Sequence, residues 1–238
     1  MLLHNQGELD QAEAIYRQVL AVDNDNFYAL NFCGCILREK KLFEEGIVLL
    51  NRAVALQSTN PDAHYNLGNI FKDAERWNEA ISCYEKSLGL RAQYPEALNN
   101  LGICFINVER YDHSMIVLQR AVALQPGFTD AWLNLGNTLK RQEKFPEAIN
   151  SYRKAIKVKP DFADAYFNLG NVLEEEGEVK EAIGCYRKAI EVKPDFAEAY
   201  LNLGNMLQGE DELEESIACY RKAIELKPDF AEAYLNLG

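Results

Sequence analysis

One sequence step recurs through this chain of 238 residues at a fixed spacing. A glycine, preceded by Asn-Leu in every case but the first, returns every 34 residues without an insertion or a deletion. The series is Gly34, Gly68, Gly102, Gly136, Gly170, Gly204 and Gly238. A fixed period of about 20–50 residues is the signature of repeat architectures. The chain is therefore expected to be a repeat array, so its length does not convert into a number of globular domains.

The register divides the chain into six complete repeats and two partial ones. The complete repeats are 27–60, 61–94, 95–128, 129–162, 163–196 and 197–230, with a partial repeat 1–26 before them and a partial repeat 231–238 after them. Positions within a repeat are numbered here from 1 to 34, which places the recurring glycine at position 8. The whole range 1–238 is expected to form a single array. Because the two partial repeats add up to one repeat, the array is expected to have two unfinished end faces.

Two helices are expected in each repeat, because apolar residues recur with helical spacing in two segments separated by turns near positions 15–16 and 32–33. In the repeat 163–196 the first segment places Ala165, Leu169 and Leu173 on one face, and the second places Ala182 and Tyr186 on one face. A glycine inside a helix costs about 1 kcal/mol relative to alanine. Its recurrence at position 8 therefore indicates that a neighbouring helix approaches closely. The helices of one repeat cannot bury their apolar faces alone, so the repeats must stack.

The segments between helices carry residues that end and begin helices. Three repeats end with Lys-Pro-Asp-Phe, in which the proline ends the second helix. Asp161, Asp195 and Asp229 are predicted to be the N-caps of the helices that follow. Pro61 and Pro95 are expected in the first turn of a helix, where no intrahelical donor is required.

Composition narrows the classes of function. Hydrophobic residues make up 48% and charged residues 26%, which is typical of a folded chain. With 25 basic and 37 acidic residues the net charge is −12, which argues against binding to nucleic acid, because that binding needs clustered Lys and Arg. No apolar run is long enough for a membrane span or a signal peptide. We therefore expect a cytoplasmic protein that does not insert into a membrane.

The cysteines and histidines form no pattern typical of a catalytic or metal site. Cys83, Cys185 and Cys219 share position 23, where a small buried residue is expected. His64 replaces an aromatic residue at position 4 and is expected in the core, and His113 is expected near the start of a helix. Glycine-rich phosphate loops are absent from the sequence. We therefore expect that the chain is not an enzyme and uses neither a cofactor nor a metal. Its thiols are expected to stay reduced.

The 34-residue pattern resembles that of the tetratricopeptide repeat (TPR) family. The family signature has an aromatic residue at position 4, Leu-Gly at 7 and 8, a bulky apolar residue at 11, Ala at 20 and 27, an aromatic residue at 24 and Pro at 32. The repeat 129–162 supplies Trp132, Leu135, Gly136, Leu139, Ala148, Tyr152, Ala155 and Pro160. The first complete repeat departs from the signature, with Gly46, Leu50 and Ser58 at positions 20, 24 and 32. The resemblance implies an all-α TPR solenoid, a right-handed superhelix of antiparallel helix pairs whose first helices line a concave groove that binds other proteins.

Asparagines on the first helices are the main candidates for contact with a ligand. Positions 2, 5, 6, 9, 12 and 13 lie opposite the buried face, and asparagine recurs at two of them. The asparagines at positions 6 and 9 are Asn66, Asn69, Asn100, Asn134, Asn137, Asn168, Asn171, Asn202, Asn205 and, in the last partial repeat, Asn236. Two interpretations stay open: the amides tie neighbouring helices together, or they form a ladder that hydrogen-bonds an extended peptide. At these positions the chain is similar to the asparagine-lined arm of O-GlcNAc-transferase-like proteins.

Other residues of the same face would give a ligand selectivity. Position 5 carries apolar residues, namely Tyr65, Leu133, Phe167 and Leu201. Positions 12 and 13 are basic in the earlier repeats, with Lys72, Lys140 and Arg141, and acidic later, with Glu174 and Glu175. Either the groove is electrically polarised along its length, or this is a mixed solvated surface.

The sequence therefore predicts a noncatalytic protein–protein interaction scaffold that binds an extended peptide or a partner helix in the groove. Two alternatives stay open. Because the sequence stops at Gly238 within a first helix, the chain could be the N-terminal, substrate-recruiting arm of a larger bacterial transferase of glycosyltransferase type. Its unfinished ends could instead stack on further copies and form a homo-oligomer.

Overall fold

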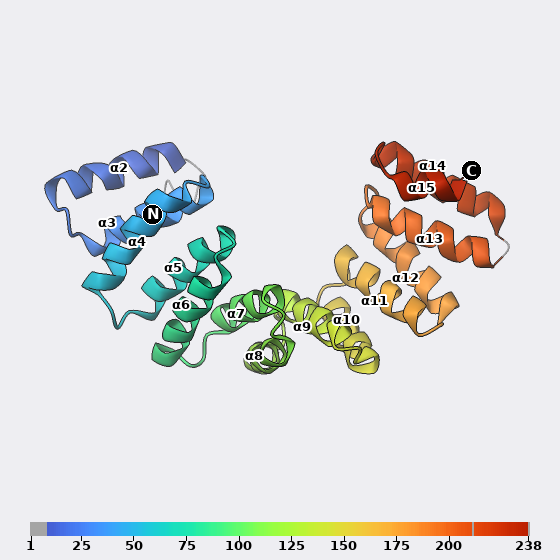
Figure 1. Cartoon of the computed structure of the whole chain (residues 1–238), viewed down its shortest axis with the longest axis horizontal. Helices are drawn as coiled ribbons and strands as arrows, with labels where there is room; N and C mark the ends of the chain where they lie inside the picture. Colours follow the sequence, from blue (N-terminus) through green and yellow to red (C-terminus); the bar gives the residue numbers. More distant parts are fainter. Residues whose placement is uncertain (1–8, 211, 238) are drawn as a thin grey trace. The chain divides into compact units, whose positions relative to one another are not determined.

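The computed structural model of the chain describes residues 9–210 and 212–237, and all regular structure in these ranges is α-helical (Figure 1). The helices are α2 (Leu9–Val22), α3 (Phe27–Glu39), α4 (Phe43–Leu56), α5 (Pro61–Asp73), α6 (Trp77–Leu90), α7 (Pro95–Asn107), α8 (Tyr111–Leu124), α9 (Thr129–Arg141), α10 (Phe145–Val158), α11 (Ala163–Glu175), α12 (Val179–Val192), α13 (Ala197–Gly209), α14 (Leu213–Leu226) and α15 (Ala231–Leu237). The predicted all-α class is confirmed. Gly238 and the first eight residues of the partial repeat 1–26 lie outside the described residues.

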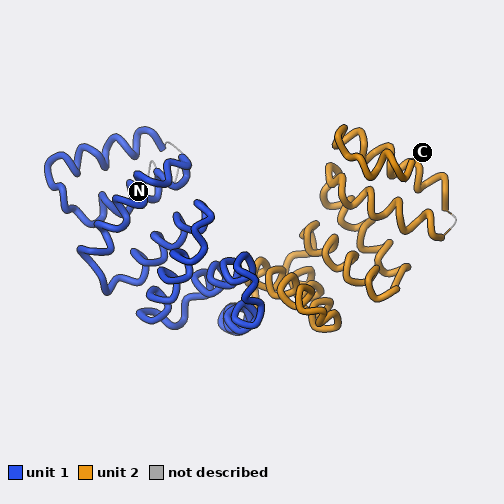
Figure 2. The backbone as a smooth tube through the Cα atoms, in the orientation of Figure 1, with its two compact units in different colours: residues 1–125 blue, residues 126–238 orange. Residues whose placement is uncertain are grey.

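The helices belong to two compact units, residues 1–125 and residues 126–238 (Figure 2). Unit 1 contains α2 to α8, and unit 2 contains α9 to α15. The odd-numbered helices from α3 to α15 begin at position 1 of a repeat and are named A helices here. The even-numbered helices occupy the second half of each repeat and are named B helices.

The starts of the A helices agree only in part with the sequence prediction. Pro61 and Pro95 occupy the first turns of α5 and α7, as expected. The prediction that aspartates cap the later A helices is wrong. The N-cap residues of α11 and α13 are Phe162 and Phe196, which make no side-chain cap hydrogen bond, and α15 begins only at Ala231, so Asp161, Asp195 and Asp229 all lie before the cap. Each of these two phenylalanines is 8% exposed, so burial of its ring fixes the chain at the helix start.

The turns that follow α3, α5, α7, α9 and α11 each contain a residue in the left-handed conformation at position 15. Glu143 has φ 58° and Gly177 has φ 77°. After α9 the backbone N–H of Glu143 donates to the carbonyl of Lys140 at 2.9 Å, and that of Lys144 donates to the carbonyl of Leu139 at 3.0 Å. These two bonds form a Schellman motif, which satisfies carbonyls at the end of the helix.

The core of each repeat lies where the glycine of the A helix meets the residue at position 24 of the B helix. A Cβ atom on Gly170 would lie 2.7 Å from Cε1 of Tyr186, and one on Gly102 would lie 2.6 Å from Cγ of Leu118. Real Cβ contacts are not this short, so a methyl group has no room. The close approach predicted from the recurring glycine is confirmed.

The cysteines belong to this packing. All six are free thiols, and the three at position 23 are buried, as predicted. Burial raises the pKa of Cys83, Cys185 and Cys219 to about 11 each. Because the thiolate is the reactive form, these thiols are inert at neutral pH.

Candidate functional site

Hydrogen bonds join the asparagines of successive A helices in unit 2. In each bond Nδ2 of the asparagine at position 6 donates to Oδ1 of the asparagine at position 9 of the preceding repeat. The bonds are Asn168 to Asn137 (3.2 Å), Asn202 to Asn171 (2.9 Å) and Asn236 to Asn205 (2.8 Å). They tie α11 to α9, α13 to α11 and α15 to α13.

The same Oδ1 atoms accept a second hydrogen bond from the tyrosine at position 24. The bonds are Tyr152 to Asn137, Tyr186 to Asn171 and Tyr220 to Asn205, each at 2.9 Å. Two of these hydroxyls have a second acceptor, because that of Tyr186 lies 2.6 Å from a carboxylate oxygen of Glu174 and that of Tyr220 lies 3.2 Å from Oε1 of Gln208. Burial raises the pKa of Tyr152 and Tyr186 far above neutral, so both hydroxyls keep the proton that they donate. An amide oxygen has two lone pairs, and the protein uses both. The apolar pattern predicted only packing for these tyrosines, although each follows a position-9 asparagine by 15 residues.

Unit 1 contains one such arrangement and one variation of it. Oδ1 of Asn69 accepts from the hydroxyl of Tyr84 at 2.7 Å and from Nδ2 of Asn100 at 2.9 Å. In the variation, Nδ2 of Asn66 donates at 3.1 Å to Oδ1 of Asn31, and Asn31 stands at position 5 of α3 instead of position 9. Asn69 is only 6% exposed, so we assign it to the tie between helices and leave it out of the candidate ligand surface.

The network in unit 2 leaves a regular set of polar groups for other partners. Among the residues that the structure describes, Nδ2 of Asn137, Asn171 and Asn205 donates to no group, and Oδ1 of Asn168 and Asn202 accepts from none. All five side chains are half-buried and reach the surface. The helices α9, α11 and α13 thus each offer an N–H donor at position 9, and α11 and α13 also offer an oxygen acceptor at position 6. The two interpretations of the asparagines are therefore compatible, because different atoms of one side chain serve each.

The apolar residues at position 5 are less accessible than the helical pattern predicts. Tyr65, Leu133 and Phe167 are half-buried, and the ring of Phe167 packs against that of Phe196 at 4.8 Å between centroids. The expectation of an exposed position 5 is wrong at Leu201, which is 3% exposed. It lies in an apolar cluster with residues of α14 and α15, so the next repeat covers it.

The charged residues at positions 12 and 13 are partly neutralised within each unit. Nζ of Lys140 lies 2.7 Å from a carboxylate oxygen of Glu175, and Nζ of Lys72 lies 3.3 Å from one of Asp73. Arg141 is exposed. Because a basic residue of α9 pairs with an acidic residue of α11, the structure favours the mixed surface over a polarised groove.

The histidines have structural surroundings. His64 is 6% exposed, and its Nε2 lies 2.8 Å from the carbonyl oxygen of Ser58. His113 is on the surface of α8, with its ring centroid 5.4 Å from that of Phe105. Within residues 9–210 and 212–237 no group of three or more His, Cys, Asp and Glu side chains is placed to hold a metal ion. No helix in these ranges is long and apolar enough to cross a membrane.

Family models match the chain along its length. A model described as TPR repeat matches residues 34–74, 136–177, 170–209 and 210–238. Models described as tetratricopeptide repeat match residues 1–27, 61–94 and 95–128. The chain therefore belongs to the tetratricopeptide repeat family. The fold of this family stacks repeats into extended binding surfaces, which supports a role in protein interaction.

Solved structures of the family share this fold. MamA is 28% identical, with a TM-score of 0.64, over 70% of this chain and 97% of that chain. PilF of Pseudomonas aeruginosa is 19% identical, with a TM-score of 0.74, over 96% of this chain and 97% of that chain. YrrB, described as a TPR protein with an unusual peptide-binding site, is 22% identical, with a TM-score of 0.64, over 78% of this chain and 96% of that chain. Comparison with curated proteins gives no match.

Proposed function

We propose that this chain is a noncatalytic interaction module that binds an extended peptide segment of a partner protein along the A helices of unit 2. The observation that carries the proposal is the alternation of donors and acceptors on α9, α11 and α13. Nδ2 of the position-9 asparagines and Oδ1 of the position-6 asparagines have no partner in the described part of the chain. The likeness of these positions to the arm of O-GlcNAc-transferase-like proteins supports the same mode of binding.

The arrangement suits a peptide backbone, because each peptide group offers one N–H donor and one carbonyl acceptor. A peptide N–H would donate to Oδ1 of Asn168 or Asn202, and a peptide carbonyl would accept from Nδ2 of Asn137, Asn171 or Asn205. Packed helices lie roughly 8–10 Å apart, and an extended chain advances roughly 3.3–3.6 Å per residue. About every third residue of the peptide would therefore meet an asparagine.

The internal bonds prepare these amides for binding. Oδ1 of Asn137 accepts from Tyr152 at 2.9 Å and from Asn168 at 3.2 Å, so the amide cannot flip without losing both bonds. A side chain already held in one orientation loses little entropy when a ligand binds. The ties between helices thus support ligand binding.

Backbone contacts alone give modest affinity. Five hydrogen bonds at ~0.5–1.5 kcal/mol each contribute roughly 2.5–7.5 kcal/mol, against an association cost of roughly 4–15 kcal/mol. Side-chain contacts must supply the rest, and the half-buried Leu133 and Phe167 are the apolar groups nearest in sequence to the asparagines. We therefore expect a preference for peptides with apolar side chains between the backbone contacts.

The test compares three variants in binding peptides of about twelve residues that are selected from a random library on the intact chain. N168A/N202A removes two acceptors and is expected to weaken binding by roughly 5- to 150-fold, the equivalent of two hydrogen bonds. Y152F/Y186F removes internal bonds but keeps all five asparagines, and N150A changes an exposed asparagine of α10. Both controls are expected to bind within about threefold of the unmodified chain. Unchanged binding by a folded N168A/N202A variant would overturn the proposal.

A further inference from the structure

Consecutive B helices are joined at three places by an ion pair between position 25 of one repeat and position 19 of the next. The pairs are Arg17 with Glu45 (2.6 Å), Arg153 with Glu181 (2.6 Å) and Arg187 with Glu215 (2.9 Å). In each pair the arginine lies on the earlier B helix and the glutamate on the later one.

The helices α6 and α8 lack this bridge. Position 25 of α6 is Glu85 and position 19 of α8 is His113, so the acidic residue stands on the earlier helix. Glu85 is exposed and forms no ion pair or hydrogen bond with any residue of the described ranges. Position 29, which is charged in all three complete repeats of unit 2, is Gly89, and a methyl group there would have open space around it.

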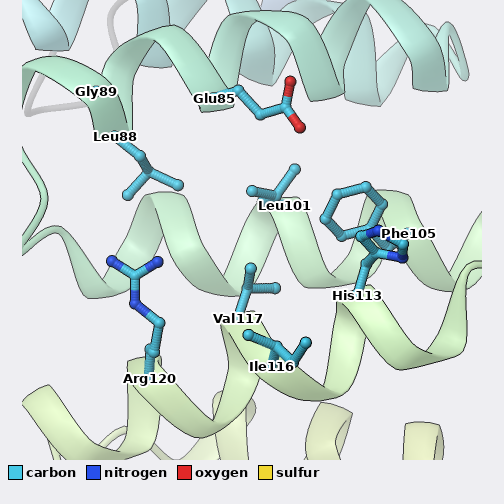
Figure 3. Close-up of a pocket in the computed structure, with 9 residues that line it drawn as sticks. All are labelled: Glu85, Leu88, Gly89, Leu101, Phe105, His113, Ile116, Val117 and Arg120. Atoms are coloured by element: carbon cyan, nitrogen blue, oxygen red, sulfur yellow. The ribbon is translucent and has the colours of Figure 1, made fainter.

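The consequence is an apolar cleft in unit 1 with a volume of about 360 Å³, named the α6–α8 cleft here. Leu101 and Phe105 of α7 line its interior, and each is 3% exposed. Ile116 of α8 lies at its edge and is 54% exposed, although the three complete repeats of unit 2 carry asparagine, glycine and alanine at this position. Figure 3 shows Glu85 on one side of the space and Ile116 on the other.

We propose that the α6–α8 cleft binds one bulky apolar side chain, aromatic or aliphatic, from a segment of a partner protein that carries a lysine or arginine beside that side chain. The volume suits a single large side chain, and the exposed surface of Ile116 would be covered by it. The basic residue would give Glu85 the ion pair that the arginines at position 25 form elsewhere.

The charges of the cleft favour a basic neighbour over an acidic one. The cation among the lining residues is Arg120, which donates from Nη2 to the carbonyl oxygen of Ala92 at 3.4 Å. In Figure 3 its guanidinium lies beside Leu88, at the other end of the space from His113. That bond to a neutral carbonyl leaves the charge of Arg120 in place, so the preference for a basic neighbour rests on Glu85, which has no ion pair among the described residues, and on the net charge of −12 of the chain. The cleft is lined by residues of α6, α7 and α8 in unit 1, so it shares no residue with the asparagine surface of α9, α11 and α13.

The test installs the residues of the bridged helices in the cleft. E85R/H113E/G89E gives α6 and α8 the side chains that α12 and α14 carry at the same positions, and it is expected to fold because unit 2 folds with them. Peptides of about twelve residues are selected from a random library for binding to the intact chain, and the affinity of each selected peptide is then measured for this variant. The proposal expects enriched peptides with an aromatic residue or leucine beside a lysine or arginine, and binding at least about tenfold weaker to the triple variant.

Further variants separate the other outcomes. E85Q removes the charge with little change of shape, and it is expected to weaken binding of the selected peptides several-fold. N168A/N202A changes the asparagine surface instead, so it is expected to leave the affinity of these peptides unchanged. Enriched peptides that bind the triple variant and the unmodified chain equally would overturn the proposal, as would a selection that yields no peptide sensitive to E85Q. Sedimentation that shows self-association lost in the triple variant would identify a second copy as the occupant and would also overturn it.

Discussion

Replacing Asn137 with alanine is expected to lower stability by an amount that depends on Tyr152. Oδ1 of Asn137 accepts from the hydroxyl of Tyr152 at 2.9 Å and from Nδ2 of Asn168 at 3.2 Å. Tyr152 is 0% exposed, whereas the two asparagines reach the surface. In Asn137→Ala the buried hydroxyl loses its only acceptor among the described residues, and the amide of Asn168 can turn to water instead.

The magnitudes follow from that difference in burial. A buried hydroxyl left without an acceptor costs ~1–3 kcal/mol, and an internal hydrogen bond contributes a net ~0.5–1.5 kcal/mol. We therefore expect the free energy of unfolding to fall by about 2 kcal/mol in Asn137→Ala and by about 1 kcal/mol in Tyr152→Phe. In the double variant no hydroxyl remains to be stranded, so the total loss is expected to be about 1.5 kcal/mol, roughly half the sum of the single effects.

The assay is a double-mutant cycle from urea unfolding followed by circular dichroism. Because repeat arrays can unfold in parts, hydrogen exchange of the backbone amides of α9 and α10 supplies a local measurement of the same cycle. Asn150→Ala, on the exposed surface of α10, is the matched control and is expected to change stability by less than about 0.5 kcal/mol. Single effects that add within about 0.5 kcal/mol would refute the coupling.

Three further predictions concern packing, a turn and pH. Gly170→Ala puts a methyl 2.7 Å from the ring of Tyr186 and is expected to cost about 1–2 kcal/mol, whereas Gly184→Ala, with open space, is expected to stabilise by about 0.5–1 kcal/mol; equal melting temperatures would contradict this. Glu143→Gly removes a left-handed non-glycine residue with φ 58° and is expected to stabilise by about 1 kcal/mol in urea unfolding, so an unchanged or lower midpoint counts against it. Burial raises the pKa of Cys185 from 9.0 to about 11, so the unfolded chain loses this proton first, and stability is expected to fall as pH rises from 9 to 11. Cys185→Ala is expected to reduce the fall in melting temperature over that range; an equal fall in both proteins would exclude a contribution from this thiol.

The helices could be predicted from the sequence because the same local helix signals recur in each repeat. Apolar spacing, the recurring glycine and Pro61 at a helix start all act within one helix or between its immediate neighbours. The predicted aspartate caps were wrong because tertiary packing, which local sequence patterns do not show, sets where these helices start. Burial of Phe162 and Phe196 fixes where the chain enters the helix, and burial depends on packing against other elements.

The sequence predicted which residues belong to the candidate site but not which of their atoms are already hydrogen-bonded within the protein. Helical spacing places Asn171 on the face opposite the core, yet it does not show that Tyr186 and Asn202 occupy its oxygen. Spacing also could not show that residues of α14 and α15 cover Leu201.

The α6–α8 cleft had a signal in the sequence, since Glu85 stands where four other repeats, one of them the partial repeat 1–26, carry arginine, and His113 stands where the following complete repeats carry glutamate. Only the structure shows that these two positions face each other across neighbouring B helices, because the pairing joins residues 28 apart, as it does in Arg187 with Glu215.

Replacing peptide N–H groups with N-methyl groups tests whether asparagines of unit 2 bind the backbone of an extended peptide. A selected peptide of about twelve residues is synthesised with one backbone N-methyl group at each position in turn, and its affinity is measured for the intact chain and for N168A/N202A. Losses of about three- to tenfold are expected at two residues of the peptide about three apart, because each of them loses one hydrogen bond of ~0.5–1.5 kcal/mol to Oδ1 of Asn168 or Asn202. Both losses are expected to disappear in N168A/N202A. Losses spread over many positions, or the same losses in both proteins, would show that these asparagines do not bind the peptide backbone.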